Sequence, residues 1–318
     1  MITPLDYGII NKPSFRQHQF ETAVQTVAAF NSGAKVIGVN APCGFGKTLY
    51  CVAVAKMLEV PPLYVCETHA LQTQFMRDFA SMGAEELKGR ANYPCLKNPN
   101  NTADLCGYKN PNCDTCILSK TGCTPDAKNH CSCRKDCPYE VQKMKTMNAP
   151  IAVLNMAYYL QEVNHAGGFD NRELVVLDEA DETEKALMDF IELRISDSMV
   201  TRYNLTHPKF KTKPESWREW GNETLQIVNF QLSKLNSFWG TEDLREKQQL
   251  ERLKRKLEFF NAEADDGWVF DGVNTFKPIR IAKYAEAFLW KHASRFLLMS
   301  ATLSPWHQLI RDLGVTDE

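Results

Sequence analysis

The sequence lacks the features that mark membrane and secreted proteins. No apolar run is long enough to span a bilayer, and the N-terminus has no basic stretch followed by an apolar one, as a signal peptide would have. A dominant charge is also missing, because 37 Lys and Arg against 39 Asp and Glu give a formal net charge of −2. We therefore expect a cytoplasmic protein with no membrane partner, in which a polyanion would need a local basic patch.

Histidine pairs with the spacing of metal ligands are absent among the seven histidines, so none is predicted to be catalytic. With 44% hydrophobic and 24% charged residues over 318 positions, the chain is expected to form two globular domains or one with large insertions. Five apolar runs predict the buried strands of a mostly parallel sheet in an α/β fold, namely 36–39, 63–66, 151–154, 174–177 and 296–299.

The chain is organised around one loop, Ala41-Pro42-Cys43-Gly44-Phe45-Gly46-Lys47-Thr48. A predicted strand precedes it and a helix-compatible stretch follows, which is the context of a phosphate-binding loop. Backbone N–H groups of such a loop and the positive end of the helix can face one anion. Lys47 would reach the β- and γ-phosphates of ATP, and Thr48 would contact Mg²⁺. Ala41 stands where glycine usually opens this motif.

A second motif, Asp178-Glu179-Ala180-Asp181, follows the apolar run 174–177. A carboxylate at the end of a parallel strand is where a nucleotide site holds its Mg²⁺. We predict that Asp178 holds the metal through water and that Glu179 orients or deprotonates the attacking water. The alternative is an acidic helix start, favoured by the helix dipole. The presence of the phosphate-binding loop favours the metal site.

Further polar residues lie at the ends of predicted strands and near the start of a helix predicted over 14–31. Arg16 and Gln19 lie near this start, where the Gln19 amide would either pair with adenine or be solvated. Thr68 would either hold a nucleic-acid phosphate or cap a helix. Ser300 and Thr302 would bond to the acidic motif and sense the nucleotide.

Eight of the eleven cysteines lie between Cys95 and Cys137, in a stretch with little that could form a core. Such a segment becomes ordered only when it is cross-linked, and in an intracellular chain a metal is favoured over disulfides. Four thiolates would hold zinc or a [4Fe–4S] cluster, and spacing does not separate the two. Eight candidates exceed one four-ligand site, so a second metal, a spare pair or spare thiols remain open.

Residues 215–260 are purely helical in pattern, and two leucine stripes separated by a turn predict an antiparallel hairpin. Twelve Lys and Arg against eight Asp and Glu make residues 201–260 locally basic. Nucleic-acid phosphates would contact the basic residues 209, 211, 213 and 254–256, and bases would stack on Trp217 or Trp220. The alternative is a solvated helix face.

In their order along the chain, these motifs resemble a superfamily-two helicase motor with a DEAD box; the blocks are Arg16 with Gln19, 41–48, Thr68 with Gln72, 178–181 and 300–302. The cysteine segment narrows the resemblance. It opens with Gly89-Arg90-Ala91-Asn92-Tyr93-Pro94-Cys95 and closes with Cys137-Pro138-Tyr139, which is similar to the XPD- and DinG-type iron–sulfur helicases. That family often has His where this chain has Asp181. The resemblance covers essentially the whole chain.

The resemblance implies an ATP-dependent helicase that moves 5′ to 3′ on single-stranded or forked DNA and serves DNA repair, in the cytoplasm or nucleoid. The implied domains are a RecA-like motor (1–88, 141–184 and 291–318), an iron–sulfur insertion (89–140) and an arch-like helical insertion (185–290). The implied catalytic residues are Lys47, Asp178 and Glu179. ATP would also contact Arg16, Gln19, the residues Ala41, Pro42, Cys43, Gly44, Phe45 and Gly46, Ser300 and Thr302, with Mg²⁺ at Thr48 and Asp178.

The same resemblance implies a [4Fe–4S] cluster, with zinc as the alternative metal. Its expected ligands are Cys95, Cys113, Cys116 and Cys137, and the other candidates are Cys106, Cys123, Cys131 and Cys133.

Such motors contain two ATPase domains, and the second supplies an arginine to the γ-phosphate. Only the first is expected here, because the sequence ends at residue 318, shortly after Thr302. We therefore expect the N-terminal half of a motor that needs a second RecA-like domain for full activity. The alternative function is a nucleotide-switched, metal-stapled DNA-binding module without motor action.

Overall fold

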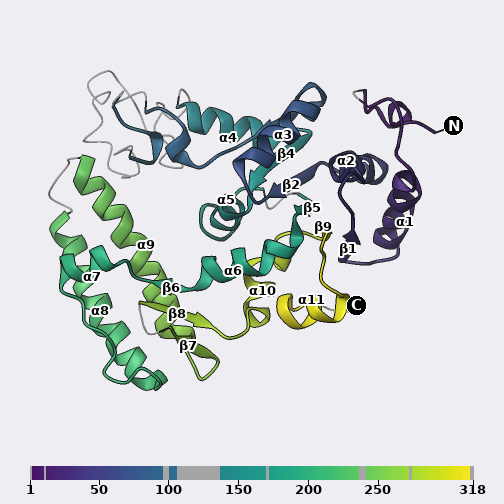
Figure 1. Ribbon diagram of the computed structural model, residues 1–318. Helices are drawn as coiled ribbons and strands as arrows, with labels where there is room; N and C mark the ends of the chain where they lie inside the picture. Colours follow the sequence, from purple (N-terminus) through teal and green to yellow (C-terminus); the bar gives the residue numbers. More distant parts are fainter. Residues whose placement is uncertain are drawn as a thin grey trace. The chain divides into compact units, whose positions relative to one another are not determined.

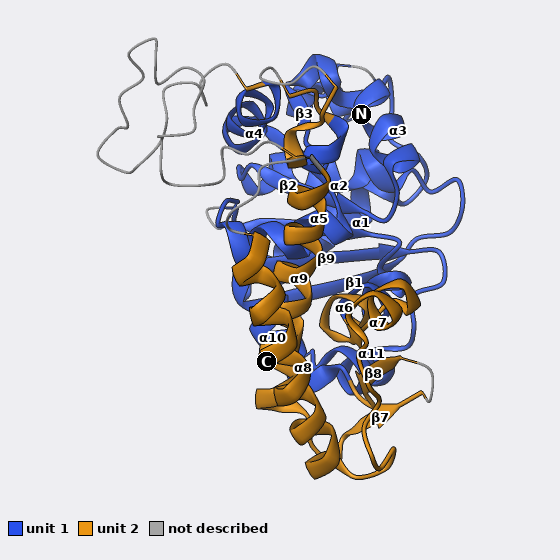
Figure 2. Ribbon diagram, turned by 90° about the vertical axis from the view of Figure 1, so that its left-hand side faces the viewer, with its two compact units in different colours: residues 1–92, 138–187, 281–318 blue, residues 93–137, 188–280 orange. Residues whose placement is uncertain are grey.

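The protein is described here from a computed structural model, in which two compact units account for the chain (Figures 1 and 2). The first unit contains residues 1–92, 138–187 and 281–318, and the second contains 93–137 and 188–280. The structure describes residues 2–10, 12–95, 100–105, 137–169, 172–235, 241–271 and 274–315.

A six-stranded sheet forms the centre of the first unit, with every neighbouring pair of strands parallel. Its strands, in spatial order, are β1 (Val36–Asn40), β9 (Arg295–Ser300), β5 (Leu174–Asp178), β2 (Pro62–Cys66), β4 (Ile151–Asn155) and β3 (Ala84–Glu86). The α/β architecture and all five predicted strands are confirmed. The short edge strand β3 was not predicted, since its polar residues give no apolar run.

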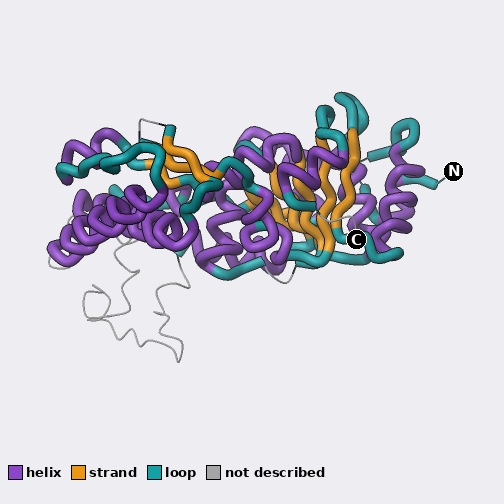
Figure 3. The backbone as a smooth tube through the Cα atoms, turned by 90° about the horizontal axis from the view of Figure 1, so that it is seen from below, coloured by secondary structure: helices purple, strands orange, loops and turns teal. Residues whose placement is uncertain are grey.

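Helices of the first unit lie on both sides of this sheet (Figure 3). They are α1 (Gln19–Asn31), α2 (Lys47–Leu58), α3 (His69–Phe79), α4 (Pro138–Asn148), α5 (Met156–Gln161), α10 (Ala282–Phe288) and α11 (Trp306–Leu313), and α6 (Thr183–Ile191) crosses into the second unit. One face of the sheet and helices α1, α2 and α3 form a continuous apolar core around Tyr64, Val176 and Met299. On the opposite face, Trp290 packs edge-on against Phe296, with ring centroids 4.9 Å apart.

Helix α1 begins later than the residue predicted, at Gln19 instead of close to Ser14. The residue before it, His18, adopts a left-handed conformation with φ of 61°. His18 is part of a turn in which the N–H of Gln19 donates to the carbonyl of Arg16 at 3.1 Å. This tight turn stops the helix from extending toward residue 14.

The second unit contains a helical hairpin and a small antiparallel sheet. Helices α8 (Pro214–Leu235) and α9 (Thr241–Glu263) run antiparallel, since Arg218 bonds to the carbonyl of Ala264 and Asn222 pairs with Asn261. This confirms the predicted hairpin. The remaining elements are α7 (Asp197–Tyr203) and the sheet β6 (Leu193–Arg194), β8 (Thr275–Pro278) and β7 (Trp268–Phe270), which was not predicted.

The core of the second unit is aromatic. Trp217 and Trp220 are only 3% and 5% exposed, and Trp220 stacks on Phe276 with ring centroids 5.0 Å apart. The expectation that either tryptophan stacks on a nucleic-acid base is therefore wrong. Lys256 is also occupied, because its ammonium group donates to the carbonyls of Asp189 and Glu192 at 3.0 and 2.7 Å.

Within the described residues, no helix combines the length and the apolar character that crossing a bilayer requires.

Candidate active site

The loop between β1 and α2 turns through two glycines in the left-handed conformation. Gly44 and Gly46 adopt positive φ angles of 86° and 85°, which favour glycine. A Cβ on Gly46 would lie 2.7 Å from the Gln19 amide nitrogen, so a larger residue does not fit without movement. Ala41 is fully buried, and its N–H donates to the carbonyl of Ser300 at 2.7 Å. The turn therefore forms with alanine at its first position.

Arg16 and Gln19 brace this loop from the side. The fully buried Gln19 amide donates to the carbonyls of Phe45 and Gly46 at 3.1 and 2.8 Å and accepts from the N–H of Arg16 at 3.0 Å. The Arg16 guanidinium donates to the carbonyl of Gly44. In this structure both polar ends of the Gln19 side chain are bonded to protein. Its predicted contact with adenine stays a prediction.

Lys47, Asp178 and Glu179 converge at the carboxyl ends of the central strands. The Lys47 Nζ lies 2.5 Å from Glu179 Oε1 and 3.5 Å from Asp178 Oδ1. Burial alone would lower the pKa of Lys47, but the hydrogen bond to Glu179 and the charge of Asp178 outweigh it and raise that pKa. The lysine is therefore cationic and lies between two carboxyl groups that are 132 and 131 positions away in sequence.

Tyr64, on the neighbouring strand β2, fixes the Asp178 carboxyl group by a hydrogen bond. Its hydroxyl donates to Asp178 Oδ2, and the ring is 1% exposed and packs on Phe75 at 4.1 Å between centroids. Burial raises the pKa of Asp178, and the Tyr64 hydrogen bond and the Lys47 charge oppose that rise. The other oxygen, Oδ1, is buried, has no hydrogen-bond partner among the described residues, and lies 3.5 Å from Lys47 Nζ.

Glu179 has an unusual backbone conformation for a non-glycine residue, with φ of 52° and ψ of 53°. Such conformations cost about 1–3 kcal/mol and concentrate at functional sites. Here the turn separates the side chains of Asp178 and Glu179, so that one is held within the sheet and the other is half-buried beside Lys47.

Asp181 connects the acidic motif to the end of β9. Its carboxylate accepts from the Ser300 hydroxyl at 2.5 Å and from the Thr302 hydroxyl at 2.9 Å. Burial would raise the pKa of Asp181, but these two hydrogen bonds outweigh it and lower that pKa. The predicted contact between the two motifs is thus present as a side-chain contact.

These residues fit a magnesium-bound nucleotide triphosphate. The loop is open above Gly44, where an added Cβ would meet nothing within 4 Å. Thr48 is the second residue of α2, a helix long enough for its N-terminus to favour a bound anion, and it lies beside Lys47. The buried and unbonded Asp178 Oδ1 is an oxygen ligand of the kind that Mg²⁺ or its water prefers.

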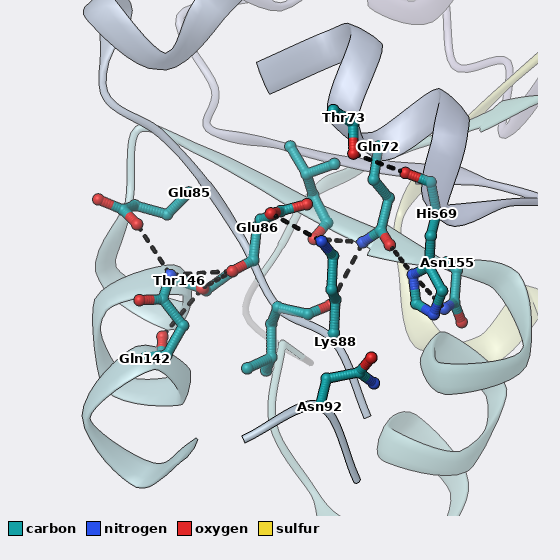
Figure 4. A network of polar contacts seen from close by, with 12 residues as sticks. His69, Gln72, Thr73, Glu85, Glu86, Lys88, Asn92, Gln142, Thr146 and Asn155 are labelled. Carbon is teal, nitrogen blue, oxygen red and sulfur yellow. Dashed lines mark hydrogen bonds and ion pairs between the residues drawn. The ribbon is translucent and has the colours of Figure 1, made fainter. Parts of the chain in front are cut away.

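A polar network surrounds the ends of β3 and β4 (Figure 4). The fully buried Gln72 donates to the carbonyls of Leu87 and Val153 at 3.3 and 3.4 Å, and His69 Nδ1 lies 2.6 Å from its amide oxygen. The Thr68 hydroxyl accepts from a backbone N–H of the first turn of α3 at 3.3 Å. Thr68 therefore caps the helix, as one of the two alternatives predicts, and its contact with a phosphate stays a prediction.

The cysteine cluster lies mostly outside the described residues. Cys95 is buried and Cys137 is half-buried, and neither forms a disulfide with another described cysteine. The other predicted candidates, Cys106, Cys113, Cys116, Cys123, Cys131 and Cys133, fall in the part of the chain that is not described. In the described part, no three His, Cys, Asp or Glu side chains form a group that could hold a metal ion.

Tyr64 is the site residue that sequence analysis missed. It lies in an apolar run and reads as a core residue, and only the pairing of β2 with β5 brings it to the acidic motif. The hydroxyl group of a tyrosine within an otherwise apolar strand is the signal that could have indicated it.

Comparison with known structures gives the same fold. A structure named Truncated XPD shares 18% identity and a TM-score of 0.54, over 92% of this chain and 96% of its own. A structure named XPD_Helicase shares 19% identity with a TM-score of 0.59, over 95% of this chain and 61% of its own. A structure named XPD_APO shares 15% identity with a TM-score of 0.55, over 93% of this chain and 56% of its own. The chain thus has the RecA-like α/β fold of XPD structures and spans about three fifths of the two longer ones.

No significant match was found among curated proteins. A protein-family model described as "Type III restriction enzyme, res subunit" matches residues 12–200, which is more than half of the chain. The protein that carries this lysine and acidic pair at the edge of a parallel sheet therefore belongs to the family of the type III restriction enzyme res subunit.

Proposed function

We propose that this chain is the N-terminal motor half of an ATP-dependent DNA helicase of the iron–sulfur type, moving 5′ to 3′ on single strands. The observation that carries the proposal is the convergence of Lys47 with Asp178 and Glu179 at the end of a loop with two glycines of positive φ. Membership of the res-subunit family and the XPD fold support it.

The chemistry would follow from an exchange of partners at Lys47. When phosphate oxygens reach the loop, the Lys47 ammonium group would leave its ion pair with Glu179 and contact these oxygens instead. Glu179 would then be free to accept a proton from the attacking water. Asp178, held by Tyr64, would keep its free oxygen directed at the metal site. Bound Mg²⁺ would supply charge neutralisation on the phosphates.

A second RecA-like domain is the partner that we propose. The two longer XPD structures extend well beyond the part that this chain covers. An arginine from such a domain would stabilise the charge that develops on the γ-phosphate, and residues of this kind raise hydrolysis by about 10³–10⁵-fold.

The test uses the 318-residue chain alone and with a separately produced second ATPase domain. We expect the chain alone to bind Mg·ATP, to hydrolyse it slowly and not to unwind a forked duplex. Addition of the second domain should restore hydrolysis that single-stranded DNA stimulates, and the Lys47→Ala variant should abolish this effect. Unwinding by the isolated chain would refute the need for a partner. Failure of the rescue with intact ATP binding would favour the DNA-binding module without motor action.

Iron, sulfide and zinc analysis of anaerobically purified protein tests the metal. About four iron atoms per chain with a brown colour supports the [4Fe–4S] cluster. A colourless zinc protein would contradict the iron–sulfur assignment and leave the nucleotide site unaffected.

A further inference from the structure

A basic loop with an exposed aromatic ring connects α7 to α8 in the second unit. It runs from Thr206 to Lys213, and no Asp or Glu occurs between Asp197 and Glu215. Every residue of this loop is exposed except Pro208, which is buried. The Phe210 side chain is 48% exposed, which is uncommon for a large aromatic ring.

Two lysines lie beside the exposed ring of Phe210, and a third lies beside Phe270. The ammonium groups of Lys209 and Lys213 lie 5.6 and 5.1 Å from the centroid of Phe210, and that of Lys211 lies 5.8 Å from the centroid of Phe270. Among the described residues, none of the three lysines forms an ion pair with a carboxylate. Among the described residues the loop therefore has three cations without acidic partners, and two of them lie beside the exposed ring of Phe210.

The loop is fixed to the hairpin at several points. The Trp220 indole donates to the carbonyl of Thr206 at 2.6 Å, and the Ser216 hydroxyl accepts from the N–H of Phe210 at 3.0 Å. The N–H of Trp217 also donates to the carbonyl of Lys213 at 3.2 Å. Because its backbone is held in this way, the loop loses little conformational entropy when a ligand binds.

We propose that this loop, residues 206–213, is a binding site for single-stranded nucleic acid, with a base stacked on Phe210 and phosphates contacted by Lys209, Lys211 and Lys213. An exposed aromatic ring between cations fits the alternation of base and phosphate in a single strand. Lysine side chains are long and flexible, so the ammonium groups can move to phosphates while the base occupies the ring face. The buried tryptophans Trp217 and Trp220 serve as anchors of the loop and leave the stacking to Phe210.

This inference extends the proposed function to a second contact with the DNA strand, but binding at the loop requires no nucleotide hydrolysis. The two can therefore fail separately. ATP affinity and hydrolysis test the motor site, whereas the experiment below uses the nucleotide-free chain.

The experiment measures the affinity of the full chain for a fluorescent single-stranded dT oligonucleotide and for an abasic phosphodiester chain of equal length. Phe210→Ala should weaken binding of dT by roughly 5- to 150-fold, which corresponds to one stacked base, and should leave abasic binding nearly unchanged. Phe230→Ala is the matched control, because Phe230 is also exposed, at 59%, and has one lysine at 4.2 Å, but lies on the surface of α8. It should change neither affinity.

Replacing the three lysines by alanine should weaken both oligonucleotides and reduce the slope of log affinity against log salt by about 0.7 per lysine. Thermal unfolding of each variant checks that the fold is retained. Equal losses of dT affinity in the Phe210→Ala and Phe230→Ala variants would overturn the proposal. So would an unchanged dT affinity in Phe210→Ala, or an unchanged affinity in the variant without the three lysines. Tighter binding of anionic vesicles than of the oligonucleotide would also overturn it.

Discussion

Replacing Tyr64 by phenylalanine tests the geometry of the candidate active site most directly. The substitution removes one hydroxyl, whose hydrogen bond holds Asp178 Oδ2, from a ring that is 1% exposed. The Asp178 side chain is itself only 4% exposed, and its second oxygen has no hydrogen bond. After the change, the carboxyl group keeps the charge of Lys47, whose Nζ lies 3.5 Å from Oδ1.

A hydrogen bond to a charged group contributes about 1.5–3 kcal/mol, which corresponds to roughly 10- to 150-fold in an equilibrium constant. We therefore expect Tyr64→Phe to raise the Mg²⁺ concentration that is needed for half-maximal ATP binding by a factor within this range. The measurement is a titration of Mg²⁺ against a fluorescent ATP analogue, with hydrolysis measured in parallel.

Tyr50→Phe is the matched control. Tyr50 is also fully buried in the core of the first unit, but its hydroxyl pairs with the neutral hydroxyl of Thr26 at 2.6 Å. Tyr50→Phe should lose about 0.5–1.5 kcal/mol of stability and Tyr64→Phe about 1.5–3 kcal/mol, and only Tyr64→Phe should alter the response to Mg²⁺. An unchanged Mg²⁺ titration for Tyr64→Phe would refute a role of this tyrosine in holding Asp178.

Three more outcomes are expected. Gln19→Ala should weaken ATP binding and lower the free energy of unfolding by about 1–3 kcal/mol, because half-buried carbonyls such as that of Gly46 lose their donor; calorimetry and nucleotide titration check this. The pKa of Asp181 is below its ordinary value, so its stabilising bond with Ser300 is present above about pH 3.8 and is lost as the pH falls through the lowered pKa. Acid unfolding of Asp181→Asn should accordingly show a weaker pH dependence than the parent. Lys256→Met should lower the free energy of unfolding by about 1–3 kcal/mol in denaturant titration, because two carbonyls at the end of α6 lose their donor, and should leave ATP binding unchanged.

The strands and the ends at which the polar motifs lie could be predicted because each is a local property. An apolar run such as 174–177 gives the strand, and the residue that follows it must lie at the edge of the sheet. The phosphate-binding loop is equally local, since its form depends on glycine at positions of positive φ such as Gly46. These local features were sufficient to bring Lys47 to Asp178 in the prediction.

Features that depend on the order of strands could not be predicted. Tyr64 reaches Asp178 only because β2 pairs with β5, and nothing in either run specifies that pairing. The same holds for Trp217 and Trp220, which face strands of only two to four residues that give no periodic pattern. From the sequence alone, a tryptophan on a basic helix is interpreted as a residue that contacts a ligand. The small sheet, which the sequence does not predict, makes both tryptophans core residues.

The ion pair between Lys47 and Glu179 has a consequence for timing. While no phosphate is present, the lysine occupies the carboxylate that would act as the base, at 2.5 Å. A group at the γ-position would compete for the same ammonium, so its arrival and the release of the base would be a single event. The β-phosphate of a diphosphate would also attract Lys47, but a diphosphate offers no γ-phosphate for the water to attack. The residue that binds the nucleotide would thus also determine when the Glu179 carboxylate becomes available as a base.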